Sequence, residues 1–503
     1  MPSIAKRVLR SSAQLLIIRF LNRSIGLIST LILARLLTPS DFGLVAIVAI
    51  IVQLFDVVAT SGSSQYIIQK STVDEKDLNT SWTIDIIMKT SLQLLLILIA
   101  PLVSVYYNKP ELTMAIIVAS FSLPISSFVN PGIILYKKDL EYSKILKLSV
   151  LQKLISFTTV MIIVFSTPSY WALIAGDLVS ALALTVGSYI IHSYRPKWTL
   201  SEIREQWKFS QWILFKSIFG YTRSQIDTVL VSKNFEISDV GLYHVTKHLT
   251  SITARDLISP ALTPLLAAFS ETKVSDAGQL PMQVRLALLS LVFLVSPLSI
   301  FIWSFPQPII NTLLGSQWDG AAPVLSALSL LILSFSVNQL LELFCVSQGF
   351  VKQLFFYDLL SMAVVVSVLF VSPGDTLAEF SLKRGGLGII VCGAFLIYVN
   401  YRFKLTLTKL FPLIIPIVLS ILLTTFITSW LSMYSPNVPF LKLAFLGIIF
   451  FSSYLTISIF LYLLIFRNNA DIITIFKALS PIIFKIKNRL FSFLRKHISR
   501  KRL

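Results

Sequence analysis

Apolar residues occur along this chain in long blocks that are separated by short polar connections. A helix needs about 20 residues to cross the roughly 30 Å hydrocarbon layer of a membrane. By that length the sequence predicts about fourteen membrane-spanning helices. Because no connection is long enough to fold alone, we expect an all-α polytopic membrane protein without a soluble domain. The approximate spans are 12–36, 41–63, 81–105, 112–136, 148–166, 171–193, 212–234, 240–262, 284–305, 321–348, 354–373, 385–403, 411–431 and 440–466.

Composition agrees with this pattern. Hydrophobic residues make up 55% of the chain, charged residues 13%, and the mean hydropathy is +0.80. Soluble domains carry about 25% charged residues, so a water-soluble protein is excluded. The first apolar block is too long and too polar for a secretory signal, and we interpret it as a spanning helix. Cys345 and Cys392 lie inside predicted spans and predict neither a disulfide nor a metal site.

The positions of the basic residues predict the topology. The net charge is +19, but basic side chains cluster in alternate connections, which indicates membrane orientation and not a nucleic-acid partner. The positive-inside rule then places both termini in the cytoplasm, which for a bacterial protein means the inner membrane. The intervening connections carry little beyond Lys109, Lys383 and Arg384. The clustered residues are Lys6, Arg7, Arg10, Lys70, Lys76, Lys137, Lys138, Lys144, Lys147, Arg195, Lys197, Arg204, Lys208, Arg402, Lys404 and Lys409.

A repeat of long period divides the chain. Ser40-Asp41-Phe42-Gly43-Leu44 follows the first span, and Ser238-Asp239-Val240-Gly241-Leu242 follows the seventh, 198 residues later. Both copies close an odd-numbered span, so they have the same orientation in the membrane. This arrangement predicts two six-helix lobes related by a parallel repeat, at 1–200 and 201–405, with two further helices at 406–466.

The last segment, 467–503, changes character. Apolar residues alternate there with lysines and arginines, a pattern typical of a basic amphipathic helix. We expect this segment to lie on the anionic lipids of the cytoplasmic leaflet, where each basic residue contributes about 1 kcal/mol. An orienting anchor is favoured over a tail that binds a partner.

Two predicted spans carry a stripe of basic residues. A charge at the centre of a spanning helix costs about 2.5–3.5 kcal/mol, so such residues usually face a protein interior or an aqueous cavity. Offsets of 0, 3, 4, 7 and 11 residues place each set on one helical face. The first span contributes Arg19, Asn22, Arg23, Gly26 and Thr30, and the eighth contributes His244, Lys247, His248, Ser251 and Arg255.

Further charges lie in other spans. Arg223 and Asp227 in the seventh span, and Asp85 and Lys89 in the third, are each four residues apart. Internal ion pairs would explain those two pairs as well as ligand binding does. They would not explain Arg19 and Arg23, because two like charges one turn apart repel unless an anion lies between them.

The basic surplus indicates an anionic ligand, and phosphate fits best because arginine binds its oxygens in a bidentate manner. Lys216 lies nearer a helix end and is interpreted as reaching the interface. The candidate substrate-binding residues are Arg19, Asn22, Arg23, Lys89, Arg223, Lys247, His248 and Arg255. We expect no cofactor and no metal, and Asp56, Asp85 and Asp227 are the candidates for coupling transport to a proton or sodium gradient.

Catalytic motifs are missing from the sequence. It contains no phosphate-binding GxxxxGK[ST] loop, no HExxH pair, no GxSxG elbow and no paired-cysteine metal spacing. A transporter is therefore favoured over an enzyme.

Three segments resemble the signatures of the polysaccharide transporter family, a branch of the superfamily that holds multidrug extruders and Wzx-type flippases. They are residues 33–44, Gln225-Ile226-Asp227 with Val240-Gly241-Leu242-Tyr243, and 313–323. The last is similar to the colanic-acid-exporter branch. The resemblance implies a two-lobed bundle that exports undecaprenyl-pyrophosphate-linked oligosaccharide by alternating access through a cationic cavity. It also implies that a polysaccharide polymerase and chain-length machinery are partners of the protein.

Three alternatives stay open from the sequence. The first is another lipid-linked cargo, such as a peptidoglycan precursor or a teichuronic-type polymer. The second is a membrane polymerase or ligase, which usually needs a large outer loop that is not predicted here. The third is a multidrug cation antiporter, which the basic stripes disfavour.

Overall fold

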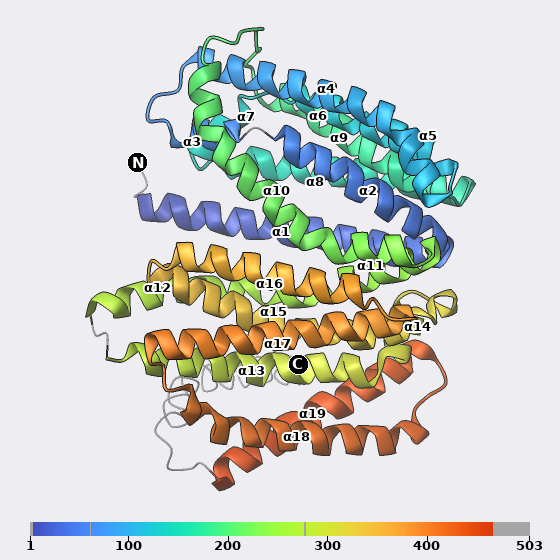
Figure 1. Ribbon diagram of the computed structural model, residues 1–503, viewed down its shortest axis with the longest axis vertical. Coiled ribbons are helices and arrows are strands. Elements are labelled where there is room, and N and C mark those ends of the chain that lie inside the picture. Colours follow the sequence, from blue (N-terminus) through green and yellow to red (C-terminus); the bar gives the residue numbers. More distant parts are fainter. Residues whose placement is uncertain (1–3, 61, 276–277, 466–503) are drawn as a thin grey trace, which may run out of the picture. The chain divides into compact units, whose positions relative to one another are not determined.

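The structure is a computed structural model that describes residues 4–60, 62–275 and 278–465, and most of these residues are helical while none lies in a strand (Figure 1). The all-α polytopic membrane fold is therefore confirmed. The helices are α1 Ile4–Leu36, α2 Pro39–Ala59, α3 Ser63–Gln69, α4 Glu75–Tyr107, α5 Glu111–Ser120, α6 Ser122–Ser127, α7 Ile133–Lys138, α8 Tyr142–Ser166, α9 Trp171–Ile191, α10 Ile203–Asn234, α11 Ile237–Ser251, the π-helix Ile252–Leu257, α12 Ser259–Ser275, α13 Leu280–Ser304, α14 Pro306–Leu313, α15 Ala321–Ser347, α16 Val351–Val371, α17 Leu377–Phe403, α18 Leu410–Leu431 and α19 Pro439–Ile465.

Ten helices in the described part of the chain are long and apolar enough to cross a membrane. The fourteen crossings stay a prediction. The fourth predicted span, 112–136, is not one helix but is divided among α5, α6 and α7. The eighth, 240–262, is interrupted by the π-helix Ile252–Leu257. The C-terminal segment 467–503 lies outside the described residues.

The chain forms two compact units. The first contains residues 1–246, 313–321 and 366–377, and the second contains 247–312, 322–365 and 378–503. Helix α10 and most of α11 thus belong to the same unit as the N-terminal helices, where the Tyr221 hydroxyl donates to the Ile50 carbonyl of α2 at 2.7 Å. The predicted lobe limits at 200 and 405 stay predictions.

In the second unit, the two last helices pack against α13 (Figure 1). The Tyr454 hydroxyl of α19 donates to the Phe293 carbonyl of α13 at 2.8 Å, and Tyr462 donates to Leu413 of α18 at 2.6 Å. The buried Arg285 donates to Thr406 at 2.7 Å and so holds the connection between α17 and α18. These bonds satisfy polar groups that would otherwise be costly in a membrane interior.

The two copies of the sequence repeat lie against each other within the first unit. Gly43 is the fifth residue of α2 and Gly241 the fifth of α11. A Cβ atom on Gly43 would overlap the carbonyl oxygen of Ile237, and one on Gly241 would overlap that of Pro39. Since Pro39 and Ile237 are also 198 residues apart, the contact is reciprocal and relates the two copies by a local twofold axis.

A third segment, 313–321, covers this contact. Helix α1 ends at Leu36, so its last carbonyls lack partners within the helix. The buried Trp318 donates from its indole nitrogen to the Ala34 carbonyl at 2.6 Å, and Gln317 donates to Leu37 at 3.2 Å. Trp318 also packs edge-on against Phe42, with ring centroids 5.3 Å apart. Gly315, with φ of 101°, makes the turn that few other residues tolerate.

The first two signature segments and residues 313–321 of the third therefore lie together in the first unit, near the end of α1 that the positive-inside rule predicts to face outward. The first copy is fixed by a capping box, in which Asp41 accepts from the Thr38 amide at 3.0 Å. The capping bond accounts for the presence of Asp41 in the signature, and the close approach of two backbones accounts for Gly43.

We expect Gly43→Ala and Gly241→Ala each to lower stability by about 1–3 kcal/mol, because the added methyl group meets a backbone carbonyl that cannot rotate away. Thermal unfolding of the detergent-solubilised protein measures this effect. Gly386→Ala is the matched control, since nothing lies within 4 Å of its Cβ position. Equal melting temperatures for all three variants would contradict the close contact.

Candidate functional site

The stripe of α1 is partly described. Arg23 is exposed, and the side-chain oxygen of Asn22 is buried with no hydrogen-bond partner among the described residues. The Thr30 hydroxyl donates to the Gly26 carbonyl at 3.0 Å, so its hydrogen bond lies within α1. The Arg19 side chain lies outside the described residues. Arg23 is therefore the arginine of this stripe whose side chain is described, and its role in binding stays a prediction.

The stripe predicted for the eighth span departs from an unbroken α-helix. Lys247 and His248 are half-buried in α11 and belong to the second unit. The π-helix that follows Ser251 changes the helical register, so an offset of eleven residues no longer places His244 and Arg255 on one face. The Arg255 side chain lies outside the described residues.

Asp227 has a structural partner. Its side chain is 3% exposed and accepts from the Tyr243 hydroxyl at 3.0 Å and from the Thr228 amide at 2.9 Å. Tyr243 is fully buried. Both residues belong to the second signature, so this bond explains their joint occurrence by fastening α10 to α11. Arg223, four residues earlier, is exposed on α10.

Lys89 lies near the middle of α4 and contacts two other helices. Its ammonium forms an ion pair with Asp56 of α2 at 3.0 Å and donates to the Ser126 hydroxyl of α6 at 2.9 Å. Its side chain is 13% exposed, whereas that of Asp56 is 45% exposed. Asp85, the partner considered from the sequence, accepts from the Ser63 hydroxyl at 3.5 Å. The ion pair thus joins two helices that the spacing of residues could not relate.

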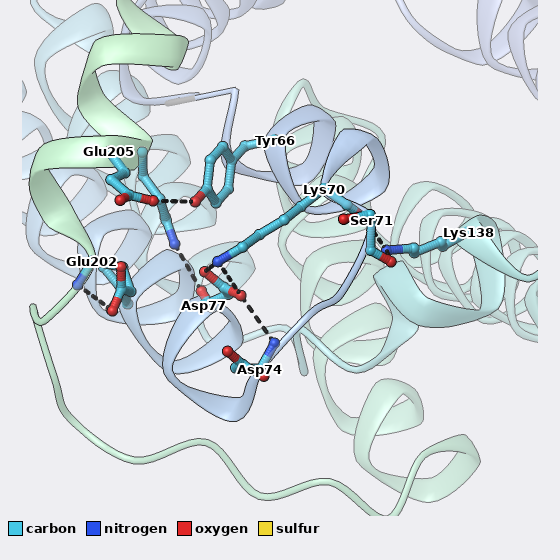
Figure 2. A network of polar contacts seen from close by, with 10 residues as sticks. Tyr66, Lys70, Ser71, Asp74, Asp77, Lys138, Glu202 and Glu205 are labelled. Atoms are coloured by element: carbon cyan, nitrogen blue, oxygen red, sulfur yellow. Dashed lines mark hydrogen bonds and ion pairs between the residues drawn. The ribbon is translucent and has the colours of Figure 1, made fainter.

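A polar network that sequence reasoning missed joins α3, α4, α7 and α10 at the end predicted to be cytoplasmic (Figure 2). Asp77 is fully buried and forms an ion pair with Lys70 at 2.8 Å, which raises the pKa of Lys70. Lys138 donates to the carbonyls of Lys70 and Ser71. The Tyr66 hydroxyl donates to Glu205 at 3.1 Å. The capping box at Asp74 and Asp77 was the one sequence signal available.

The connection from α9 to α10 is also fastened to the first unit. The buried Asn130 donates to the carbonyl of Tyr194 at 2.7 Å, and Tyr194 in turn donates from its hydroxyl to Asn79 at 2.8 Å. His192 accepts at Nδ1 from the Tyr194 amide at 3.1 Å. Burial, with Lys144 and Arg195 nearby, lowers the pKa of His192.

The described residues contain no cluster of side chains that could hold a metal ion.

Comparison with protein families adds an independent line of evidence. A family model described as "Polysaccharide biosynthesis protein" matches residues 32–323, more than half of the 503 residues. The chain belongs to this polysaccharide biosynthesis protein family. The matched range contains all three signature segments, and the resemblance drawn from them is confirmed.

Individual members of this family and its relatives are distant in sequence. The chain is 22% identical over 301 residues to the succinoglycan biosynthesis transport protein ExoT of Rhizobium meliloti (strain 1021), which covers 59% of this chain and 61% of that protein. It is 23% identical over 320 residues to the lipopolysaccharide biosynthesis protein WzxC of Escherichia coli (strain K12), covering 62% and 64%. The chain thus spans less than two thirds of these relatives.

Solved structures show the fold. The lipid II flippase MurJ, in its inward closed conformation, matches with a TM-score of 0.69 at 15% identity, covering 89% of this chain and 98% of that one. An inward-facing multidrug resistance MATE family transporter of the MOP superfamily matches with a TM-score of 0.53 at 12% identity, covering 77% and 98%. This chain therefore shares the multi-helical fold of these two solved transporters.

Substitutions at Asp227 separate a structural role from ion coupling. We expect Asp227→Asn to keep transport near the wild-type level, because an amide oxygen still accepts from Tyr243. We expect Asp227→Ala to reduce stability by about 1–3 kcal/mol, because it removes the carboxylate that accepts from the buried Tyr243 hydroxyl and from the Thr228 amide. Thermal unfolding and a transport assay measure the two effects. Loss of transport in Asp227→Asn at normal abundance would instead assign coupling to this carboxylate.

The His192 contact predicts a pH dependence. A protonated imidazole has donors on both nitrogens, so it cannot accept from the Tyr194 amide. The pKa of His192 is lower in the folded state than in the unfolded state, where it is about 6.5. The stabilisation is therefore fully present above about pH 6.5 and is lost as the pH falls from there through the lower folded-state pKa. We expect the melting temperature to fall between pH 7.5 and 5.5, and His192→Gln to reduce that fall. An unchanged pH dependence in the variant would contradict this role.

Proposed function

We propose that this protein is a flippase that moves an oligosaccharide linked to undecaprenyl pyrophosphate across the bacterial cytoplasmic membrane, and that it is not an enzyme. The observation that carries the proposal is the presence of Arg23, Lys89 and Arg223 within long helices of one compact unit. Cations at such positions are costly in lipid and are retained where a ligand or an aqueous path requires them.

The proposed work follows from the chemistry of the cargo. A pyrophosphate headgroup has to be neutralised while it leaves water, and the lipid tail has to stay in the bilayer. Arginine provides planar, bidentate donors for phosphate oxygens, and these bonds strengthen where water is excluded. Positive charge along the path therefore lowers the barrier for the headgroup, and alternating access of the two lobes would carry it across.

Relatives support an exported polymer without fixing its sugar. The names ExoT and WzxC refer to succinoglycan and lipopolysaccharide biosynthesis. A second candidate cargo is a teichuronic-type precursor, since the chain is also 23% identical over 341 residues to the teichuronic acid biosynthesis protein TuaB of Bacillus subtilis (strain 168). Both cargoes present an anionic headgroup to the same cations.

Further parts of the proposal concern energy and partners. Asp56 and Asp85 lie in α2 and α4 and are our candidates for coupling to a proton or sodium gradient. Both termini would lie in the cytoplasm, where the basic segment 467–503 would contact anionic lipids. The released cargo would pass to a polysaccharide polymerase and its chain-length machinery.

We expect Arg23→Ala and Arg223→Ala each to reduce translocation at least about tenfold, as expected for the loss of a charge-assisted bond of about 1.5–3 kcal/mol. Reconstituted vesicles with a fluorescent polyprenyl-pyrophosphate monosaccharide measure the accessibility of its headgroup. Lys216→Ala is the matched control, because this lysine is exposed on α10 and interpreted as an interfacial residue. Wild-type rates in both arginine variants would remove them from the path.

A further inference from the structure

The ion pair between Lys89 and Asp56 is asymmetric. Lys89 is nearly buried and held by two helices besides its own, since it contacts Asp56 of α2 and Ser126 of α6. The Ser126 hydroxyl donates to the Leu123 carbonyl at 2.9 Å, so its lone pairs are directed towards the ammonium. Asp56 is 45% exposed. The cation is therefore held by two contacts from other helices, while the carboxylate stays partly exposed.

This asymmetry matters for a carrier that also has to return without cargo. An ammonium without an anion is costly in a membrane interior, and the cost rises as water is excluded. A resident carboxylate removes that cost in the empty state. An incoming phosphate can take its place, because both anions bind an ammonium through oxygen and Asp56 is partly exposed.

We propose that Asp56 is a displaceable counter-ion for Lys89, which holds this cation in the empty carrier and gives it up to the phosphate of the cargo. The inference rests on the proposed function and assigns a separate role to each of three residues. Lys89 binds the anion, Ser126 positions Lys89, and Asp56 sets the affinity and allows the empty carrier to return. Asp56 then competes with cargo and does not assist its binding.

Competition has two opposite consequences when the carboxylate is removed. In Asp56→Asn, cargo no longer has to displace an anion, so binding should tighten about two- to fivefold, the worth of a partly exposed ion pair. Net transport should slow, because the empty carrier returns with an unpaired cation. Exchange of labelled for unlabelled cargo does not need the empty return, so the exchange rate should be kept.

The experiment uses the full chain in vesicles with the fluorescent polyprenyl-pyrophosphate monosaccharide, and compares net translocation with exchange. Asp56→Glu retains the carboxylate and should match the wild type in both. Glu379→Gln is the matched control, because it breaks another half-exposed ion pair, to Lys383 at 2.8 Å on α17. That control should change neither rate.

The double variant Asp56→Asn with Lys89→Gln tests whether the unpaired charge causes the effect. It also provides a second test if the single variant Asp56→Asn fails to fold. It has no unpaired ammonium, so its ratio of net transport to exchange should return to the wild-type value while its affinity falls. Wild-type protein that does not move the probe at all would overturn the proposed function. Wild-type protein that moves it, with Asp56→Asn unchanged in affinity and in that ratio, would overturn the counter-ion alone.

Discussion

The close approach of two backbones at Gly43 and Gly241 is the constraint on which the first unit depends. Lipid provides no hydrophobic force between helices, so their association relies on close packing and on hydrogen bonds. Two glycines at equivalent positions allow the first turns of α2 and α11 to touch through their main chains. Two hydrogen bonds hold the same unit together. Trp318 donates to the Ala34 carbonyl at the end of α1, and Tyr243 donates to Asp227. The three signature segments of the family thus describe one packed junction more than they describe a ligand.

The sequence predicted the helical fold and the signature segments that form the junction, because the length of an apolar block and the repetition of a motif can be read along the chain. It did not predict that the two copies touch, since spacing along the chain carries no distance in space. It also missed that Asp227 pairs with a tyrosine and that Lys89 pairs with a carboxylate of another helix. Periodicity can suggest pairs at i and i+4 within one helix, but it cannot suggest bonds between two helices such as these.

Two further departures have local causes. The fourth predicted span contains Pro124 and the sequence Asn130-Pro131-Gly132, and its helix is broken into three pieces, while Asn130 is used to bind the connection at Tyr194. The eighth span contains a π-helical turn, which hydropathy does not register. Of the candidate site, the basic character was predictable from composition. The partner of each charge was not, because it depends on which helices are neighbours.

The position of Trp318 in the chain has a consequence for biosynthesis. Helices α1 and α2 enter the membrane early, yet Trp318, which donates to the Ala34 carbonyl and packs against Phe42, is made 284 residues after Ala34. Until then the end of the first hairpin has exposed polar groups and an unfilled aromatic surface. The nascent protein therefore has to hold its opening hairpin in an unfinished state, and a chain that stops before residue 313 would leave a product for quality control to remove.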